Sequence, residues 1–346
     1  MTRLPPGSPQ SRIGTRAVRA LACFVGAGVF LYLIAIFWTG WELTLEGLSR
    51  LGVGALVIGA LVASTSYLWR FFRWEMTLRL YGYELPRFRH LGVYLAGLAL
   101  TTTPGKSGET FRSVLLLRDG VRLPHSLAAF VVDRATDVLG MCLLGGIAAA
   151  ATGHGLSWAW VLAFSGLLGI SCGMALVLRQ SIASRKWAGL GSRIRWLPVR
   201  GGQQMIESWA AVWRLPRLLG FSVIALFAYG TQALVFAWFC ALAGTGVSVA
   251  DCVLIFVQAT LFGAATMLPG GLGAMEAALV LQLTERGVDS ALAISLAISI
   301  RLVTLWVALS LGALSLLLAV HPSAAADDYP VPDSTAPQPG TRNPAQ

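Results

Sequence analysis

The sequence predicts an all-α polytopic membrane protein, built from six full spans and two re-entrant helical hairpins that together make about eight membrane segments. Composition predicts the class. Of the 346 residues, 56% are hydrophobic and only 12% are charged, whereas an ordinary soluble domain carries roughly 25% charged residues. Several apolar runs also reach the ~20 residues that a helix needs to cross about 30 Å of hydrocarbon.

The six spans are predicted from the length and continuity of apolar runs, whose ends carry tryptophans that suit the membrane interface. The runs cover residues 18–38, 51–69, 126–152, 158–178, 217–244 and 291–320. The first run is longer than a signal peptide's apolar core and has no small-residue cleavage site, so we expect an uncleaved span.

The two hairpins are predicted where an apolar region is interrupted by proline and glycine. Region 91–118 is broken by PGKSG at 104–108, and region 251–286 by PGGLG at 269–273. Each half has about 10 to 18 residues, and at 1.5 Å per residue the shorter halves cannot cross. Such backbone is tolerated at membrane depth only where it is buried in protein or lines a cavity.

The basic residues predict the orientation. The formal net charge is +10, and lysine and arginine concentrate in residues 1–19, 70–90 and 179–217. Re-entrant hairpins and a cytoplasmic N-terminus place all three stretches on the cytoplasmic side, as the positive-inside rule favours. We therefore expect a multi-pass protein of the inner (cytoplasmic) membrane with both termini cytoplasmic, and no nucleic-acid partner.

Three parts follow along the chain. Residues 1–17 form a basic cytoplasmic N-terminus, and residues 18–320 form a single membrane domain. Its halves are about 18–157 and 158–320, and the second contains the cytoplasmic basic loop 179–217. Residues 321–346, rich in proline, alanine and small polar residues, predict a disordered tail.

The two interrupted regions match each other, which predicts an internal repeat. Identical residues recur at an offset of 165 or, after a short insertion, 167 positions. The pairs include Pro104 and Pro269, Gly105 and Gly270, Gly108 and Gly273, Glu109 and Glu276, and Arg134 and Arg301. Under the predicted topology the two copies enter from opposite faces, which makes the halves an inverted repeat. Transporters with this architecture bind substrate near the midplane and alternate access by rocking.

Charged residues within the apolar regions are the candidate site, because each costs about 3 kcal/mol at a helix centre unless it has a partner or a use. The predicted substrate-binding residues are Glu109, Arg112, Arg134, Glu276 and Arg301, with Gly105, Gly108, Gly270 and Gly273; Pro104 and Pro269 are structural breaks. Paired arginines suit a phosphate-bearing headgroup. The alternative, strongest for Asp133 and Asp137, is that the charges are ion pairs that hold helices together. The glycines equally fit anion-binding backbone or a tight turn.

Several chemistries are excluded. Residues 104–112, PGKSGETFR, lack the GxxxxGK[ST] order of a phosphate-binding loop, so nucleotide hydrolysis is not predicted. The four histidines are far apart in sequence, and the five cysteines are scattered without CxxC spacing. We therefore predict no metal, no cofactor and no catalytic residue.

Three sequence blocks carry a family resemblance: TTTPGKSGETFRSVLLLRDGV, AAFVVDRATDVLG and MLPGGLGAMEAALVLQLTERGVDSALAISLAISIR. They resemble the membrane domain of lysylphosphatidylglycerol synthases, the flippase-like domain of multiple peptide resistance factor proteins, over roughly residues 15–320. The resemblance implies movement of a phospholipid or related polar lipid. Full-length synthases continue into a soluble aminoacyl-transferring domain, which this chain lacks, so aminoacyl transfer is not predicted.

The leading hypothesis is thus a translocator of a phospholipid or of a lipid-linked polar headgroup. One alternative is an intramembrane enzyme that modifies a lipid at one face, with Ser107, Glu109 and Arg112 as its candidates. A second is a membrane scaffold for a lipid-modifying or cell-envelope enzyme, in which the charges are structural.

Overall fold

The computed structural model describes residues 51–101, 111–153, 157–183, 210 and 212–320. Throughout these ranges the regular structure is helical and no strand occurs, so the all-α class is confirmed. The predicted first span, most of the basic loop 179–217 and the C-terminal tail lie outside the described residues.

The helices fall into two series that follow the predicted halves. The first comprises α2 (Val53–Leu80), α3 (Arg87–Leu98), α4 (Phe111–Leu116), the 3-10 turn η2 (Leu117–Asp119) and α5 (Leu123–Thr152). The second comprises α6 (Ser157–Ala183), α9 (Leu215–Leu242), α10 (Val249–Ala265), η3 (Pro269–Gly271), α11 (Ala274–Thr284), α12 (Ser290–Arg301), the π-helical turn η4 (Leu302–Trp306) and α13 (Val307–Val320).

Three helices among the described residues are long and apolar enough to cross a membrane: α2, α9 and the continuous helix Ser290–Leu318. Large apolar side chains cover the outer surface of α2, where Val53 is 76% and Leu61 is 66% exposed. In water such a surface would be an aggregation liability, whereas hydrocarbon solvates it. The chain is a membrane protein. The count of six spans and the two re-entrant hairpins stay predictions.

Helix α2 runs beyond the predicted span. The run 51–69 ends at Trp69, but the helix continues to Leu80 and buries Arg70 and Arg73. The span predicted at 51–69 therefore ends too early, and the part of the basic stretch 70–90 that holds these two arginines is helical and buried. Arginine is a good helix former, so the helix can continue through both residues. Their burial is possible because acidic and aromatic side chains of neighbouring helices lie against the guanidinium groups, as described below.

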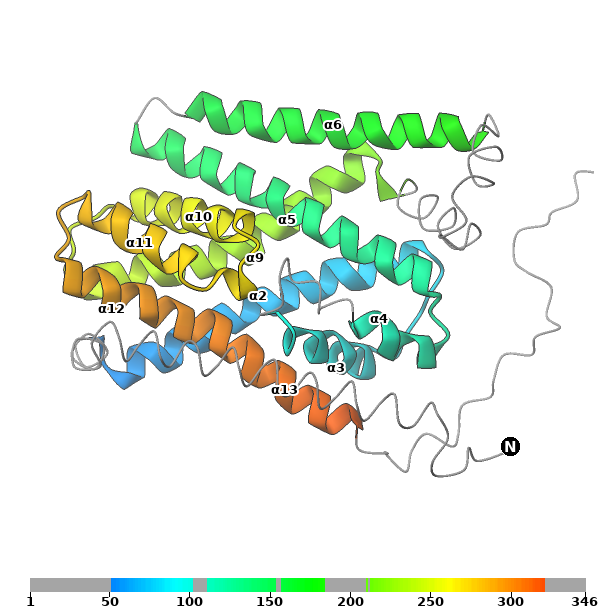
Figure 1. Ribbon diagram of the computed structural model, residues 1–346, viewed down its shortest axis with the longest axis horizontal. Helices are drawn as coiled ribbons and strands as arrows, with labels where there is room; N and C mark the ends of the chain where they lie inside the picture. Colours follow the sequence, from blue (N-terminus) through cyan, green and yellow to red (C-terminus); the bar gives the residue numbers. More distant parts are fainter. Residues whose placement is uncertain (1–50, 102–110, 154–156, 184–209, 211, 321–346) are drawn as a thin grey trace, which may run out of the picture.

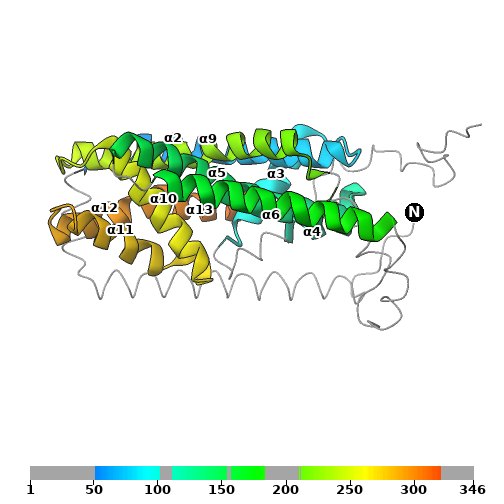
Figure 2. The same cartoon turned by 90° about the horizontal axis from the view of Figure 1, so that it is seen from above.

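The order of helices recurs in the two series. A 28-residue helix (α2, then α9) is followed by a shorter helix, a glycine-containing break, another short helix and a second long helix (α5, then α12 to α13). The packing is crossed: α3 lies against α13 of the other series, and α10 lies against α5. Helices α2 and α9 lie side by side, with α11 on the opposite face in Figure 2 (Figures 1 and 2). A short helix of each series therefore packs against the last long helix of the other series.

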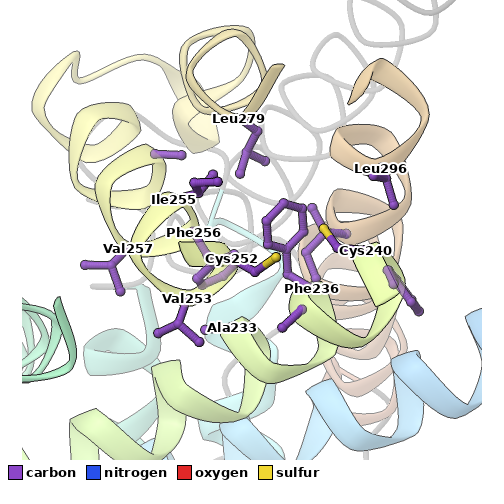
Figure 3. Close-up of a cluster of buried hydrophobic side chains, with 14 of the residues drawn as sticks. Ala233, Phe236, Cys240, Cys252, Val253, Ile255, Phe256, Val257, Leu279 and Leu296 are labelled. Carbon is purple, nitrogen blue, oxygen red and sulfur yellow. The ribbon is translucent and has the colours of Figure 1, made fainter. Parts of the chain in front are cut away.

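The largest apolar core holds the second short-helix pair in place. Buried side chains of α9, α10, α11 and α12 meet there, including Phe236, Phe256, Leu279 and Leu296 (Figure 3). Sulfur atoms of Cys240 and Cys252 lie in the same cluster. Because van der Waals packing holds helices together in lipid, this cluster fixes α10 and α11 against both neighbouring long helices.

Close helix crossings depend on small residues. A Cβ atom added at Gly312 on α13 would lie 2.2 Å from the backbone nitrogen of Ala99, just past α3. One added at Gly140 on α5 would lie 2.5 Å from the Cβ of Ala225 on α9. Small residues at such points allow the backbones to approach, which is a common basis of helix association in membranes.

An ion pair closes each short-helix pair at its base. Arg89 on α3 lies 2.6 Å from Asp119 in η2, and Arg286, just after α11, lies 3.4 Å from Asp251 on α10. Arg89 and Asp251 are 162 positions apart, and Asp119 and Arg286 are 167 apart. The same two positions are therefore joined in both series, with the acid and the base exchanged.

Candidate functional site

A cavity of about 320 Å³ lies between the two series of helices. Both contribute to its wall, which includes α2, α3 and α5 of the first and α9, α10, α11, α12, α13 and the segments η3 and η4 of the second. Most lining residues are apolar. The polar and charged ones are Tyr67, Arg70, Thr101, Arg134, Asp137, Tyr229, Gln232, Thr260, Arg301 and Thr304.

Many wall residues occur in pairs at one of two offsets: 167, which belongs to the predicted repeat, and 162, which the prediction did not include. Tyr67 and Tyr229 are 162 positions apart, and Arg134 and Arg301 are 167 apart. The offset of 162 also relates Arg70 to Gln232, and that of 167 relates Asp137 to Thr304. Corresponding positions of the two series thus face one cavity.

Arg301 ties the second glycine break to the last long helix. Its Nε donates to Glu276 Oε1 at 2.7 Å, and its Nη2 donates to the carbonyl oxygen of Gly270 at 2.6 Å. Its Nη1 also contacts the sulfur of Met275 at 3.4 Å. Arg301 is only 6% exposed, so these contacts are sheltered. One guanidinium therefore fixes both the break and the start of α11.

The helix widens directly after Arg301. Residues Leu302–Trp306 form a π-helical turn, a feature that often marks functional positions inside α-helices. Within it, the carbonyl of Thr304 accepts a hydrogen bond from the Tyr67 hydroxyl of α2. The π turn thus places a polar backbone group beside the cavity and links the two series there.

The second break has backbone geometry that few residues tolerate. Met267, just before η3, has φ of +54°, although left-handed values are uncommon outside glycine. Gly270 and Gly273 have φ of +62° and +80°. Met267 and Gly270 both line the cavity, whereas Gly273 precedes α11 as its N-cap and does not line it. A strained segment is therefore held at the cavity wall.

A buried ion-pair network lies beside the cavity. Arg73 of α2 donates to Asp133 Oδ1 at 3.0 Å and to Asp137 Oδ1 at 2.7 Å, both on α5. Arg134 lies 3.1 Å from the other oxygen of Asp137. The prediction that Asp133 and Asp137 form ion pairs between helices agrees with these distances, although the main partner, Arg73, was not foreseen.

Arg112 belongs to this network and not to the cavity wall. It is fully buried, lies 3.3 Å from Asp133 Oδ2 and stacks on the ring of Trp74 at 3.8 Å. Its other contacts include the ring of Tyr94 at 5.0 Å. An arginine enclosed by aromatic faces and a carboxylate holds α4 against α2, α3 and α5.

The structure thus brings Arg134, Arg301, Glu276 and Gly270 to one place, with Pro269 at the start of η3. Pro104, Gly105, Gly108 and Glu109 lie outside the described residues. Within the described ranges, no cluster of three histidine, cysteine or acidic residues suits a metal ion.

Four polar residues of the cavity wall are not among the residues predicted from the sequence: Tyr67, Arg70, Tyr229 and Gln232. Arg70 was assigned to a basic flank because the apolar run ends one residue earlier. The offset of 162 would have found them, since it aligns SYLWR at 66–70 with AYGTQ at 228–232. The signal that identifies these residues is a tyrosine followed three positions later by a polar residue, which occurs in both α2 and α9.

The comparison with protein families decides the relationship. Residues 22–312 match the family described as the lysylphosphatidylglycerol synthase TM region. The chain belongs to this family. None of the curated proteins compared with the chain matches it. For this member of the lysylphosphatidylglycerol synthase TM region family, membership supports a membrane domain related to lipid handling, and the match includes no soluble synthase domain.

Proposed function

We propose that this protein is a translocator of a phospholipid or lipid-linked polar headgroup, which alternates access to a cavity between two inverted halves. The observation that carries the proposal is the cavity wall, where equivalent positions of both series, Tyr67 with Tyr229 and Arg134 with Arg301, face the same space. A site shared by two similar halves can open to either side when one half rocks against the other.

The crossed packing supports the inverted arrangement. Each short helix before a break lies on the last long helix of the other series, α3 on α13 and α10 on α5. A relative movement of the halves would therefore change both contacts together. The predicted cytoplasmic location of the basic stretches places the two breaks on opposite sides of the midplane.

The size of the cavity suits a headgroup. Its volume of about 320 Å³ is at the lower end of the roughly 300–1,000 Å³ of small-molecule sites. A phosphate ester fits such a space, while acyl chains would stay in the bilayer, where the outer helix surfaces are apolar. Guanidinium groups match phosphate oxygens bidentately, so Arg134 and Arg301 are the proposed binding groups.

Two experiments test the proposal. In a background without cysteine, single cysteines at Ser107 and Ala274 are labelled in intact cells with membrane-impermeant and permeant thiol reagents. We expect labelling from opposite faces; access from the same face would contradict the inverted halves.

The second experiment measures translocation directly. Purified protein is reconstituted into liposomes, and the inward and outward pools of a fluorescent phospholipid are separated by an impermeant quencher. We expect Arg301→Gln to remove translocation while Arg79→Gln, on the exposed end of α2, retains it. Equal rates in liposomes with and without the wild-type protein would refute the function.

A further inference from the structure

Arg70 of α2 differs from the other arginines of the cavity wall. It lines the cavity and is 7% exposed, so it is more than nine-tenths buried. Its guanidinium donates no hydrogen bond to any residue of the described ranges, and its Nε is enclosed without a partner. Its close contact is with the ring of Tyr229, whose centroid lies 4.4 Å away. The ring orients the guanidinium but does not neutralise it.

The carboxylates near the cavity are already paired. Asp137 is the acidic residue of the described wall, and its two oxygens lie 2.7 Å from Arg73 and 3.1 Å from Arg134. Glu276 lies 2.7 Å from Arg301. The described wall thus has three arginines and one aspartate. Asp137 attracts Arg70 as well as Arg73 and Arg134, so one wall carboxylate serves three guanidinium groups. Positive charge at membrane depth is costly without enough counter-charge, so a further anion is expected from a ligand.

The second series has no charge at the position that lies 162 residues after Arg70. The position equivalent to Arg70 is Gln232, whose Nε2 donates to the Ser66 hydroxyl at 2.8 Å. At this position of α9, a neutral side chain therefore makes its hydrogen bond to another residue of the protein. The arginine in α2 is an addition to one half only, which favours a role in binding over one in packing.

We infer that Arg70 is the anchor of an anionic phosphate and that the headgroup bound in this cavity carries net negative charge, without an ammonium group to offset the phosphate. The inference rests on the proposed function and names its substrate class. Phosphate oxygens occupy the free guanidinium edge, and Tyr229 holds the plane of Arg70 by cation–π stacking. No carboxylate of the described wall is left to receive an ammonium group.

The test uses the full-length protein in neutral detergent micelles and three probes: dioctanoyl phosphatidic acid, dioctanoyl phosphatidylcholine and inorganic phosphate. Affinity is measured by calorimetry. We expect the wild type to bind the phosphatidic acid at least about 10-fold more tightly than the phosphatidylcholine. Loss of a charge-assisted contact predicts that Arg70→Gln, which copies Gln232, weakens phosphatidic acid binding about 10- to 100-fold. Arg70→Lys keeps most of the preference, and Arg79→Gln keeps all of it.

Equal affinity of the wild type for the two lipids, or a preference that survives in Arg70→Gln, would overturn the inference. The wild-type comparison and Arg70→Lys keep the test decisive where Arg70→Gln does not fold. If inorganic phosphate displaces the phosphatidic acid at a concentration similar to that of the lipid, the site takes free phosphate. If it does not displace the lipid, the site takes a lipid headgroup. Both outcomes place the anion at Arg70. Lack of translocation by the wild type would refute the transporter but leave this binding result standing.

Discussion

Replacement of Arg73 by glutamine tests whether the buried network beside the cavity holds the protein together. Arg73 is fully buried and donates to Asp133 at 3.0 Å and to Asp137 at 2.7 Å. Hydrogen bonds to charged groups contribute about 1.5–3 kcal/mol each, so two such bonds amount to about 3–6 kcal/mol. Since Arg112 and Arg134 still neutralise the two carboxylates, we expect a loss of about 3 kcal/mol, the lower end.

The assay is equilibrium unfolding of the purified protein in mixed micelles, with helicity followed as the fraction of denaturing detergent rises. Arg79→Gln is the matched control, because Arg79 lies on the same helix with a side chain 48% exposed and one pair, to Glu75. Exposed pairs contribute about 0–1 kcal/mol. Asp137→Asn should cost more than Arg73→Gln, since it removes the negative charge that Arg73 and Arg134 share and leaves Asp133 as the remaining described carboxylate of Arg73. A loss for Arg73→Gln no larger than that of Arg79→Gln would refute the reasoning.

The other predictions concern packing, the second break and the anion site. Gly312→Ala should cost about 1–3 kcal/mol of unfolding free energy, because its Cβ would overlap the backbone at Ala99. The control Gly166→Ala on α6 has open space around the new Cβ and should cost nothing. Equal stability of the two variants would contradict the close crossing. Arg301→Lys should lower translocation at least about 10-fold, because one ammonium cannot keep the geometry of the bonds to Glu276 and Gly270; wild-type rates would remove Arg301 from the site. Tyr229→Leu should weaken phosphatidic acid binding about 2- to 30-fold through loss of the cation–π contact, while Tyr229→Phe retains it; identical affinities would show that the ring is not needed.

The helical class and the choice of Glu276 and Arg301 as candidate residues could be reached from the sequence because they depend on local composition and on a repeated motif. Apolar length identifies a membrane helix, and an intramembrane charge requires a partner. Arg134 and Arg301 were found for the same reason, and both line the cavity.

The contributions of α2 and α9 could not be found from local composition. Arg70 and Arg73 follow an apolar run directly, so by composition they belong to an interface. Their burial depends on carboxylates and aromatic rings of α5 and α9, which are 60 or more positions away in sequence. Position along the chain does not reveal such compensation; contacts between helices do.

The two ion pairs at the bases of the short-helix pairs have a consequence for the history of the chain. Arg89 with Asp119 and Asp251 with Arg286 occupy equivalent positions, yet no residue is shared between the pairs. Under the predicted repeat, both copies keep an attraction at these positions, and the acidic and basic side chains that supply it are exchanged. Comparisons based on residue identity score these positions as unrelated. A chimera that exchanges only one member of a short-helix pair would place arginine opposite arginine or aspartate opposite aspartate.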